Sequence, residues 1–148
     1  MYKNILIPID LSHDSSWRQA LPTALELVRL FGAQLHVVTV VSDVSTVPHL
    51  HLPKDYERNR MEYARHSLDA FVKEHILDHH TPIQHVAGPG SIYREILQVA
   101  RDSSADIIVM ASHRPELKDY LLGANADRVV RHADCSVFIV REPKELGS

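Results

Sequence analysis

The stretch DIIVMASHRPELKDYLLGANADRVVRH, residues 106–132, begins with the pattern of a buried strand and ends with that of an amphipathic helix. Its first segment, Asp106–Met110, is almost continuously apolar, which is typical of a parallel strand covered by helices on both faces. Toward its end and just beyond it, apolar residues recur every three or four positions (Leu122, Ala126, Val129 and Ala133). The stretch therefore predicts a strand, a loop and a helix of a parallel α/β sheet.

The rest of the chain repeats this alternation of strands and helices. Strand-like segments are expected at Ile5–Pro8, Leu35–Val41, Ile83–Ala87 and Val137–Val140. Helical apolar stripes run from Trp17 to Phe31, with Gly32 as the stop signal, from Met61 to Ile76, and from Ile92 to Ala100. Such alternation favours a parallel sheet with right-handed crossover connections. The segment Ser42–Asp55 interrupts it, and its length favours a functional or mobile loop.

The composition is that of a soluble globular protein. The chain has 148 residues, 45% apolar and 24% charged, and we expect one domain at residues 1–142 with a flexible tail at 143–148. Its net charge of −3 gives no electrostatic basis for binding nucleic acid. We find no apolar run long enough to cross a membrane and no signal-peptide layout. The single cysteine, Cys135, cannot form an internal disulfide, so we expect a cytoplasmic protein.

Asp10 is the first candidate for a binding residue, because ligands of open parallel sheets bind at the carboxyl ends of the strands, where the strand order reverses. It follows the strand-like segment that ends at Pro8. Its carboxylate could accept a hydrogen bond from a ribose hydroxyl or an adenine amino group. The alternative is a capping role, in which a helix starts at Asp14 or Ser15 and Asp10 only accepts hydrogen bonds from backbone N–H groups.

The loop after Met110 is the second candidate, although it lacks two common phosphate-binding patterns. Neither G-x-x-x-x-G-K-[ST] nor G-x-G-x-x-G occurs in the chain. Without a P-loop lysine, phosphoryl transfer would lack its usual charge clamp. Gly123 nevertheless opens the predicted helix, whose first backbone N–H groups could hold an anion. Nearby residues add positive charge: His113, Arg114, Lys118 and Arg128.

Together these features resemble the universal stress protein family, a set of α/β domains associated with adenine nucleotides. The similarity is carried by Pro8–Asp10, Met110–Arg114, Leu121–Ala124 and Cys135–Arg141. It spans essentially the whole chain and is weakest over Ser42–Asp55. The resemblance implies an open, Rossmann-like sheet of five parallel strands in the order 3-2-1-4-5, with helices on both faces. It also implies a homodimer that pairs through the last strand.

The resemblance implies an adenine nucleotide as the ligand: ATP, ADP or AMP, with or without Mg²⁺. Adenine and ribose would then contact Pro8, Ile9, Asp10, Val40 and Met110. The phosphates would contact Ser112, Arg114, Gly123, Ala124 and Asn125, mostly through backbone groups. Taken alone, Val40 and Met110 would be interpreted as core residues. We assign no catalytic residue.

The phosphate loop departs from the family pattern G-x2-G-x9-G-[ST]. Ala111, Arg114, Gly123 and Ala124 occupy the four patterned positions, and the second gap has eight residues in place of nine. Arg114 lacks the conformational freedom of glycine, but its guanidinium group could bind a phosphate directly. Asn125 could replace the hydroxyl that is missing at Ala124. The Ser-His-Arg-Pro loop resembles a subgroup of the family that still binds adenine nucleotides, so we expect a working variant.

Three functions remain as alternatives. The first is a cytoplasmic dimer that binds ATP or AMP and reports on it to an unidentified protein partner under stress. The second is a protein-interaction module of the same fold that binds no nucleotide, with Arg114 folded into its own crevice. The third is a slow ATP hydrolase or self-phosphorylating protein, with His113 as base and Arg114 as clamp. It ranks last because we can locate neither paired carboxylates nor a nucleophile–base pair.

Eleven histidines raise the question of a metal site. The tight groups are His49 with His51, and Asp78–His80, but no spacing matches a structural zinc site. We therefore expect no metal, and we expect most other histidines to be solvated on helix faces or in loops.

The last strand-like segment, Val137–Val140, is apolar and uncharged, and we expect it at an edge of the sheet. Such an edge must be covered or paired, and pairing with a second copy about a two-fold axis would satisfy both edges. Cover by the C-terminal tail is the alternative. Cys135, just before this segment, is expected to behave as a small apolar residue.

Overall fold

Five parallel strands alternate with four α-helices in the part of the chain that the computed structural model describes, residues 1–43, 53, 55–77, 81–112 and 124–141. The strands are β1 (Asn4–Pro8), β2 (Gln34–Ser42), β3 (Ile83–Gly90), β4 (Ile107–Ala111) and β5 (Ser136–Val140). The helices are α1 (Ala20–Phe31), α2 (Tyr56–His75), α3 (Ile92–Asp102) and α4 (Ala124–His132), and a short 3-10 helix, η1, covers Asp14–Ser16. The predicted alternation of strands and helices is confirmed.

All five strands belong to one parallel sheet in the order β3-β2-β1-β4-β5, as the family resemblance implies. The central strand is β1, with β2 on one side and β4 on the other. Its register places Ile7 beside Val37 of β2 and Leu6 beside Ile108 of β4. The most continuous apolar runs of the sequence therefore form the middle of the sheet, where both faces are covered.

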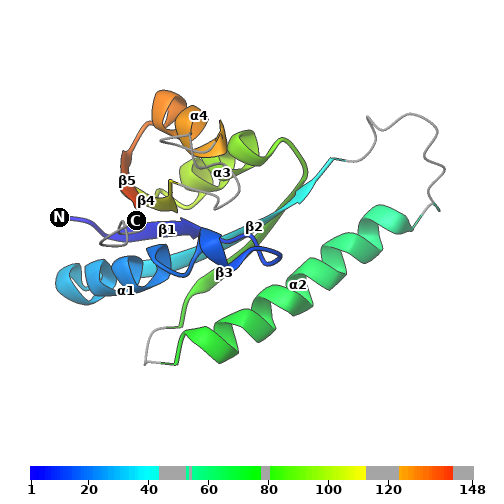
Figure 1. Ribbon diagram of the computed structural model, residues 1–148, viewed down its shortest axis with the longest axis horizontal. Helices are drawn as coiled ribbons and strands as arrows, with labels where there is room; N and C mark the ends of the chain where they lie inside the picture. Colours follow the sequence, from blue (N-terminus) through cyan, green and yellow to red (C-terminus); the bar gives the residue numbers. More distant parts are fainter. Residues whose placement is uncertain (44–52, 54, 78–80, 113–123, 142–148) are drawn as a thin grey trace, which may run out of the picture.

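Helices cover both faces of the sheet (Figure 1), and the strand side chains alternate between these faces. Ile5 and Ile7 of β1 pack in the cluster beneath α1 and α2, whereas Leu6 packs in the cluster beneath α3 and α4. All three side chains are fully buried. The molecule is therefore a three-layer structure with a hydrophobic core on each face of the sheet.

The start of α1 differs from the periodic pattern, whereas its end follows it. The helix begins at Ala20, so Trp17 precedes it, although the Trp17 ring still packs on Phe71 with the ring centroids 5.0 Å apart. The earlier start expected at Asp14 or Ser15 is the separate helix η1. At the other end, Gly32 has a φ of +61°, a left-handed conformation that confirms the predicted stop.

Some expectations concern residues outside those described. The interrupting segment Ser42–Asp55 is described only at residues 42, 43, 53 and 55, and Leu122 and the expected tail at 143–148 lie outside the described ranges. The assignment of residues 1–142 to a single domain remains a prediction.

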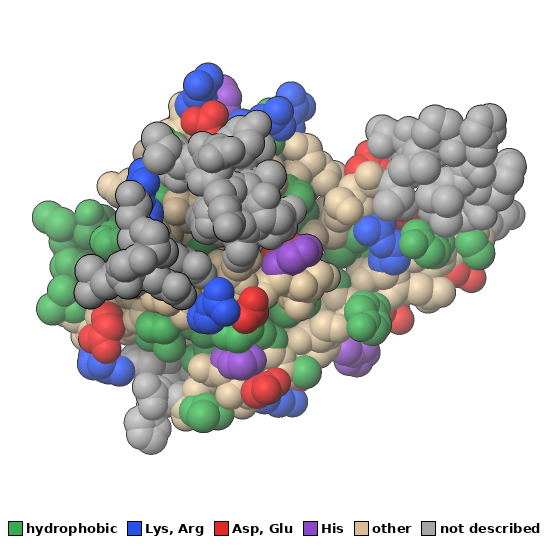
Figure 2. Space-filling model, viewed as in Figure 1, with side chains coloured by type: hydrophobic (Ala, Val, Ile, Leu, Met, Phe, Trp, Pro, Cys, Tyr) green, Lys and Arg blue, Asp and Glu red, His purple; other side chains and the backbone are tan. Residues whose placement is uncertain are grey.

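Charged side chains of both signs are mixed over the face of the molecule shown in Figure 2. A mixed surface produces no large field of one sign, and this is consistent with the net charge of −3. Among the described residues, no helix combines the length and the apolar character needed to cross a bilayer.

Candidate functional site

The sheet has its topological switch point between β1 and β4. From β1 the chain continues to β2 on one side, whereas β4 flanks β1 on the other side. The loops that leave the carboxyl ends of β1 and β4 therefore run in opposite directions, which is the arrangement that forms ligand crevices in open α/β sheets. Pro8–Asp10 lie at the end of β1 and Ser112 directly follows β4, so the structure brings these predicted site residues to the carboxyl ends of two neighbouring central strands.

Hydrogen bonds fix Asp10 beyond the end of β1. The hydrogen bonding between β1 and β2 continues through Ile9, whose N–H donates to the Val38 carbonyl of β2 at 2.7 Å. The Asp10 N–H donates to Ser16 Oγ at 2.9 Å. The Asp10 carboxylate accepts the Ser12 N–H through Oδ1 at 2.9 Å, and His13 Nδ1 lies 2.9 Å from Oδ2. The Asp10 side chain is 38% exposed, so its carboxylate is oriented by the turn and still reaches solvent.

This geometry confirms that Asp10 accepts a backbone N–H, as the capping interpretation predicts. The accepted N–H belongs to Ser12, in the turn that leads to η1 at Asp14. The carboxylate still reaches solvent, so a ligand donor could approach its exposed side, where it would compete with the present partners, including His13 at Oδ2.

The other residues predicted to contact adenosine are largely part of the core. Met110 of β4 is 8% exposed, and it packs with the partly buried Val40 of β2 in the cluster beneath α3 and α4. Ile9 is buried on the opposite face, beneath α1 and α2. Pro8, at the end of β1, is half-buried. The interpretation as a core residue is confirmed for Met110, whereas Val40 is partly buried and packs against the core; their contacts with adenosine stay predictions.

The residues predicted to contact phosphates are described only in part. Ser112 is buried, and its N–H donates to the Val140 carbonyl of β5 at 3.0 Å. The helix α4 begins at Ala124, and Asn125 is half-buried in its first turn. Arg114 and Gly123 lie outside the described residues. The described part of the predicted helix therefore begins at Ala124, the residue that follows Gly123 in the sequence.

A contact between the buried His36 and the half-buried His85 was not predicted from the sequence. His36 of β2 is 5% exposed, with its Nδ1 3.0 Å from His85 Nε2 of β3 and its Nε2 3.0 Å from Asn4 Oδ1. Because Asn4 Oδ1 can only accept, His36 donates from Nε2 and accepts from His85 at Nδ1. Burial lowers the pKa of both imidazoles, and the proximity of His85 lowers the pKa of His36 further. The expectation of solvated histidines concerned helix faces and loops. His36 lies in a strand and is buried, because β2 is covered on both faces.

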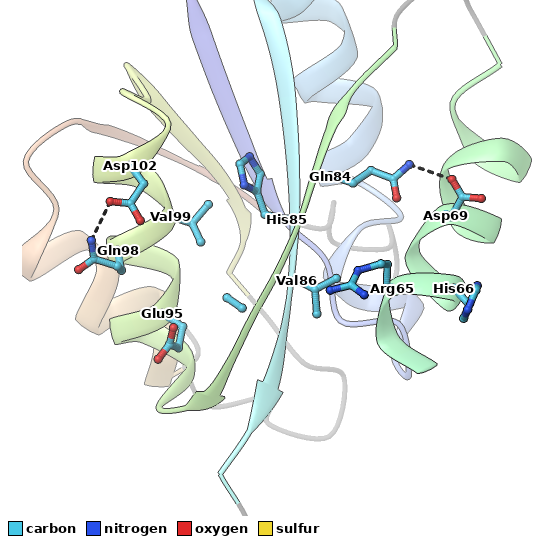
Figure 3. Close-up of a pocket in the computed structure, with 11 residues that line it drawn as sticks. Arg65, His66, Asp69, Gln84, His85, Val86, Glu95, Gln98, Val99 and Asp102 are labelled. Atoms are coloured by element: carbon cyan, nitrogen blue, oxygen red, sulfur yellow. Dashed lines mark hydrogen bonds between the residues drawn. The ribbon is translucent and has the colours of Figure 1, made fainter. Parts of the chain in front are cut away.

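A groove of about 870 Å³ runs along the outer edge of β3 (Figure 3). Its floor consists of β3 residues 84–87, and α2 and α3 provide its walls. The wall residues are Arg65, His66 and Asp69 of α2, and Glu95, Gln98, Val99 and Asp102 of α3. This groove was not predicted from the sequence, although the sequence contains one signal of it. Gln84 and His85 interrupt the apolar segment Ile83–Ala87, which is typical of an edge strand and not of a central one.

The metal question is answered only for the described residues, among which no three His, Cys, Asp or Glu side chains gather as a candidate metal site. His49, His51 and Asp78–His80 lie outside these residues. Cys135 packs, partly buried, against the cluster beneath α3 and α4, and burial raises the pKa of its thiol. This environment agrees with the expected behaviour as a small apolar residue.

The fold and its switch point define the class, an open Rossmann-like α/β protein. The model of the Universal stress protein family matches residues 1–141, and the chain belongs to this family. The chain is 30% identical over 143 residues to universal stress protein G of Escherichia coli O157:H7, an alignment that covers 95% of this chain and 100% of that protein. It is 30% identical over 152 residues to universal stress protein MJ0531 of Methanocaldococcus jannaschii, which covers 98% of this chain and 85% of that protein.

Solved structures share the fold. Hypothetical protein MJ0577 matches with a TM-score of 0.68 and 25% identity, over 98% of this chain and 99% of that chain. Universal stress protein UspA from Lactobacillus plantarum matches with a TM-score of 0.74 and 23% identity, over 95% and 98% of the two chains. A universal stress protein solved in complex with cAMP matches with a TM-score of 0.56 and 20% identity, over 95% and 97%.

Proposed function

We propose that this protein binds an adenine nucleotide (ATP, ADP or AMP) in a crevice between the loops that follow β1 and β4. The observation that carries the proposal is the Asp10 carboxylate, which Ser12 and His13 orient and which remains 38% exposed. An oriented acceptor at the end of a strand can bind a ribose hydroxyl or the adenine amino group with little loss of side-chain entropy. The cAMP complex of a similar protein supports an adenine ligand.

The phosphates are assigned to the start of α4. The N–H groups in the first turn of a helix lack partners within the helix and, together with the helix dipole, attract anions. We further propose that the Ser-His-Arg-Pro loop is a variant that retains phosphate binding, as in the subgroup of the family that it resembles, and that Mg²⁺ accompanies ATP. The assigned phosphate contacts are Ser112, Arg114, Gly123, Ala124 and Asn125.

The proposed working form is a cytoplasmic homodimer that acts in the stress response. The Val140 carbonyl points to β4, where it accepts the Ser112 N–H, so the backbone groups of the alternate residues Val137 and Ile139 point to the outer edge. Phe138 beside them is 43% exposed. Pairing of β5 with a second copy would satisfy the backbone groups and cover Phe138. Bound nucleotide would then set how the dimer engages a protein partner.

A protein-interaction module that binds no nucleotide is the second candidate. It is favoured by Ala111 and Ala124, which replace the patterned glycine and hydroxyl residue, and by the contacts that already engage both oxygens of Asp10. A slow ATP hydrolase or self-phosphorylating protein ranks third, and its candidate groups, His113 and Arg114, lie outside the described residues.

Calorimetric titration with ATP, ADP and AMP tests the proposal. Asp10→Asn keeps the size of the side chain but removes its charge, so affinity should fall about tenfold, the value of one hydrogen bond to a charged group. Asp102→Asn, at the end of α3, is the matched control and should leave the affinity unchanged. Mass spectrometry of protein purified without added ligand should find co-purifying adenine nucleotide.

The outcomes separate the three functions. If millimolar nucleotide gives neither heat nor thermal stabilisation, the proposal is wrong and the interaction module is favoured. If Asp10→Asn binds nucleotide as tightly as the wild type, the protein is a nucleotide-binding protein, but Asp10 does not contact the nucleotide. ATP turnover that is lost in His113→Ala/Arg114→Ala would favour the enzyme.

A further inference from the structure

The outer edge of β3 presents backbone groups that no other strand uses among the described residues. β3 pairs with β2 on its inner side. The carbonyl of Val38 in β2 points to β1, and Val38 lies opposite His85. In a parallel ladder this register turns the backbone of His85 toward β2, and it leaves the N–H and C=O groups of Gln84 and Val86 on the outer edge.

This edge lies along the floor of the 870 Å³ groove, whose walls differ in charge (Figure 3). Arg65 stands on the α2 wall, and in the part of the chain that is described no carboxylate pairs with it. The acidic residue of this wall, Asp69, is already paired with Lys73 at 2.8 Å. The α3 wall carries two carboxylates, Glu95 and Asp102. One wall is therefore basic and the other acidic.

The two walls rise on opposite faces of the sheet, because α2 covers one face and α3 covers the other. Successive side chains of a β-strand also point to opposite faces. A strand added to β3 would therefore direct every second side chain to the basic wall and the remaining ones to the acidic wall. Walls of opposite charge select a strand in which acidic and basic residues alternate.

We propose that the edge-strand groove, formed by β3 residues 84–87 and the facing sides of α2 and α3, binds an extended segment of a partner protein with alternating acidic and basic residues. The segment adds to the sheet beside β3. Its main chain bonds to Gln84 and Val86, its basic side chains face Glu95 and Asp102, and its acidic side chains face Arg65. This proposal does not depend on nucleotide binding.

A second copy of this chain fits the groove poorly. The segment Ile83–Ala87 contains no Asp, Glu, Lys or Arg that could neutralise the walls. Antiparallel pairing of two β3 edges about a two-fold axis would also place α3 beside α3, so that Glu95 and Asp102 would face identical carboxylates. Such like charges weaken self-association.

Two peptides of equal composition test the alternation. One has four Lys-Glu repeats, the other has four lysines followed by four glutamates, and both are acetylated, amidated and fluorescein-labelled. Fluorescence anisotropy at low salt measures their affinity for the full chain. Only the alternating peptide can satisfy both walls at once, so we expect it to bind about tenfold tighter than the block peptide.

Variants of Gln84 isolate the backbone pairing. Gln84→Ala and Gln84→Pro both remove the side chain and its hydrogen bond to Asp69. Proline additionally removes the outward N–H, and an edge strand tolerates proline where the N–H faces outward. We expect the alanine variant to keep peptide affinity within about twofold and the proline variant to lose about fivefold or more.

Amide hydrogen exchange of the wild type gives a second measurement that does not depend on the folding of a variant. The alternating peptide should protect the N–H groups of Gln84 and Val86. The N–H of His85 is already bonded to β2 and should not change. These neighbouring residues therefore provide an internal control.

The acidic wall is tested by Glu95→Gln/Asp102→Asn, which should weaken binding of the alternating peptide about fivefold. Glu26→Gln/Asp127→Asn makes the same chemical changes on α1 and α4 and should have no effect. Equal affinity for the two peptides, or no binding of either, would overturn the proposal. Binding without protection of Gln84 and Val86 would overturn it as well.

Discussion

The two edges of the sheet differ in chemistry, although both end the same parallel ladder. At one edge, β5 has five residues, reads SVFIV and carries no charge. Its Phe138 is 43% exposed. At the other edge, β3 has eight residues, includes Gln84 and His85, and lies between walls of opposite charge. Both edges present the same outward N–H and C=O groups. A partner can therefore distinguish the two edges only by their side chains.

This difference indicates how one sheet can serve two kinds of partner. An apolar edge gains buried area by pairing with an identical edge, and no charge opposes the contact. An edge between charged walls requires a partner that neutralises both walls, and it discriminates against itself. The β5 edge therefore suits a second copy of the chain, and the β3 edge suits a different chain.

The largest expected effect concerns β1, the strand on which both edges depend. Leu6 is fully buried, and Leu6→Ala should lower the free energy of unfolding by about 3 kcal/mol through lost burial and a residual cavity. Ile83→Ala, at the 45% exposed start of β3, should cost less than about 1 kcal/mol. Urea denaturation at equilibrium measures both. If Ile83→Ala lowers the free energy of unfolding as much as Leu6→Ala, the β3 edge belongs to the hydrophobic core and does not differ from the β5 edge in the way described.

The next effect concerns the apolar edge. If β5 pairs two copies as proposed, Ile139→Pro removes an outward N–H of β5 and should weaken dimerisation about a hundredfold, because proline also interrupts the pairing beside it. Ile139→Ala loses similar packing in the cluster beneath α3 and α4 but keeps the N–H, so it is the matched control. Sedimentation velocity over a concentration series reports the dimer. A proline variant that remains dimeric would place the interface elsewhere.

The fold could be predicted because its decisive signals are local. The apolar runs of β1, β2 and β4 and the stop at Gly32 are visible along the chain. The strand order is not local, and it came from the resemblance to a family. Once the order is known, the position of Asp10 at the switch point follows from connectivity.

The side-chain environment could not be predicted, because it depends on contacts between segments far apart in the sequence. His36 is buried because β1 and β3 flank β2, and its partners Asn4 and His85 lie 32 and 49 residues away. The edge-strand groove requires both α2 and α3 to flank the free edge of β3. The contact between His13 and Asp10 spans only three residues, but it depends on the conformation of the turn.

The histidine pair beside the β3 edge should make stability depend on pH. The pKa values of His36 and His85 are lowered in the folded protein by burial, so the unfolded chain takes up protons first as the pH falls. The stabilisation is fully present above about pH 6.5, and it is lost as the pH falls from there through the folded pKa values. Asp102 opposes the shift at His85 and limits the loss.

Urea denaturation at about pH 7.5 and about pH 5.5 measures this dependence. The wild type should lose more stability on acidification than His36→Gln/His85→Gln. The exposed His132 provides the control, and His132→Gln should behave as the wild type. No His, Asp or Glu occurs in β5, so the proposed pairing of two copies through β5 should not depend on pH in this range. If the double variant loses as much stability on acidification as the wild type, the two histidines have the same pKa values in the folded and the unfolded chain.

The smallest expected effect lies at the centre of the sheet, away from both edges. His13 Nδ1 lies 2.9 Å from Asp10 Oδ2, and 47% of the His13 side chain is exposed. If a nucleotide uses Asp10, it competes with His13, and His13→Ala should raise affinity about two- to fivefold, which is within the value of one hydrogen bond. Calorimetry measures the change, with His132→Ala as control, and neither dimerisation nor peptide binding should move. A fall in affinity would instead make His13 a contact of the nucleotide, and its orientation by Asp10 would then be part of the binding site.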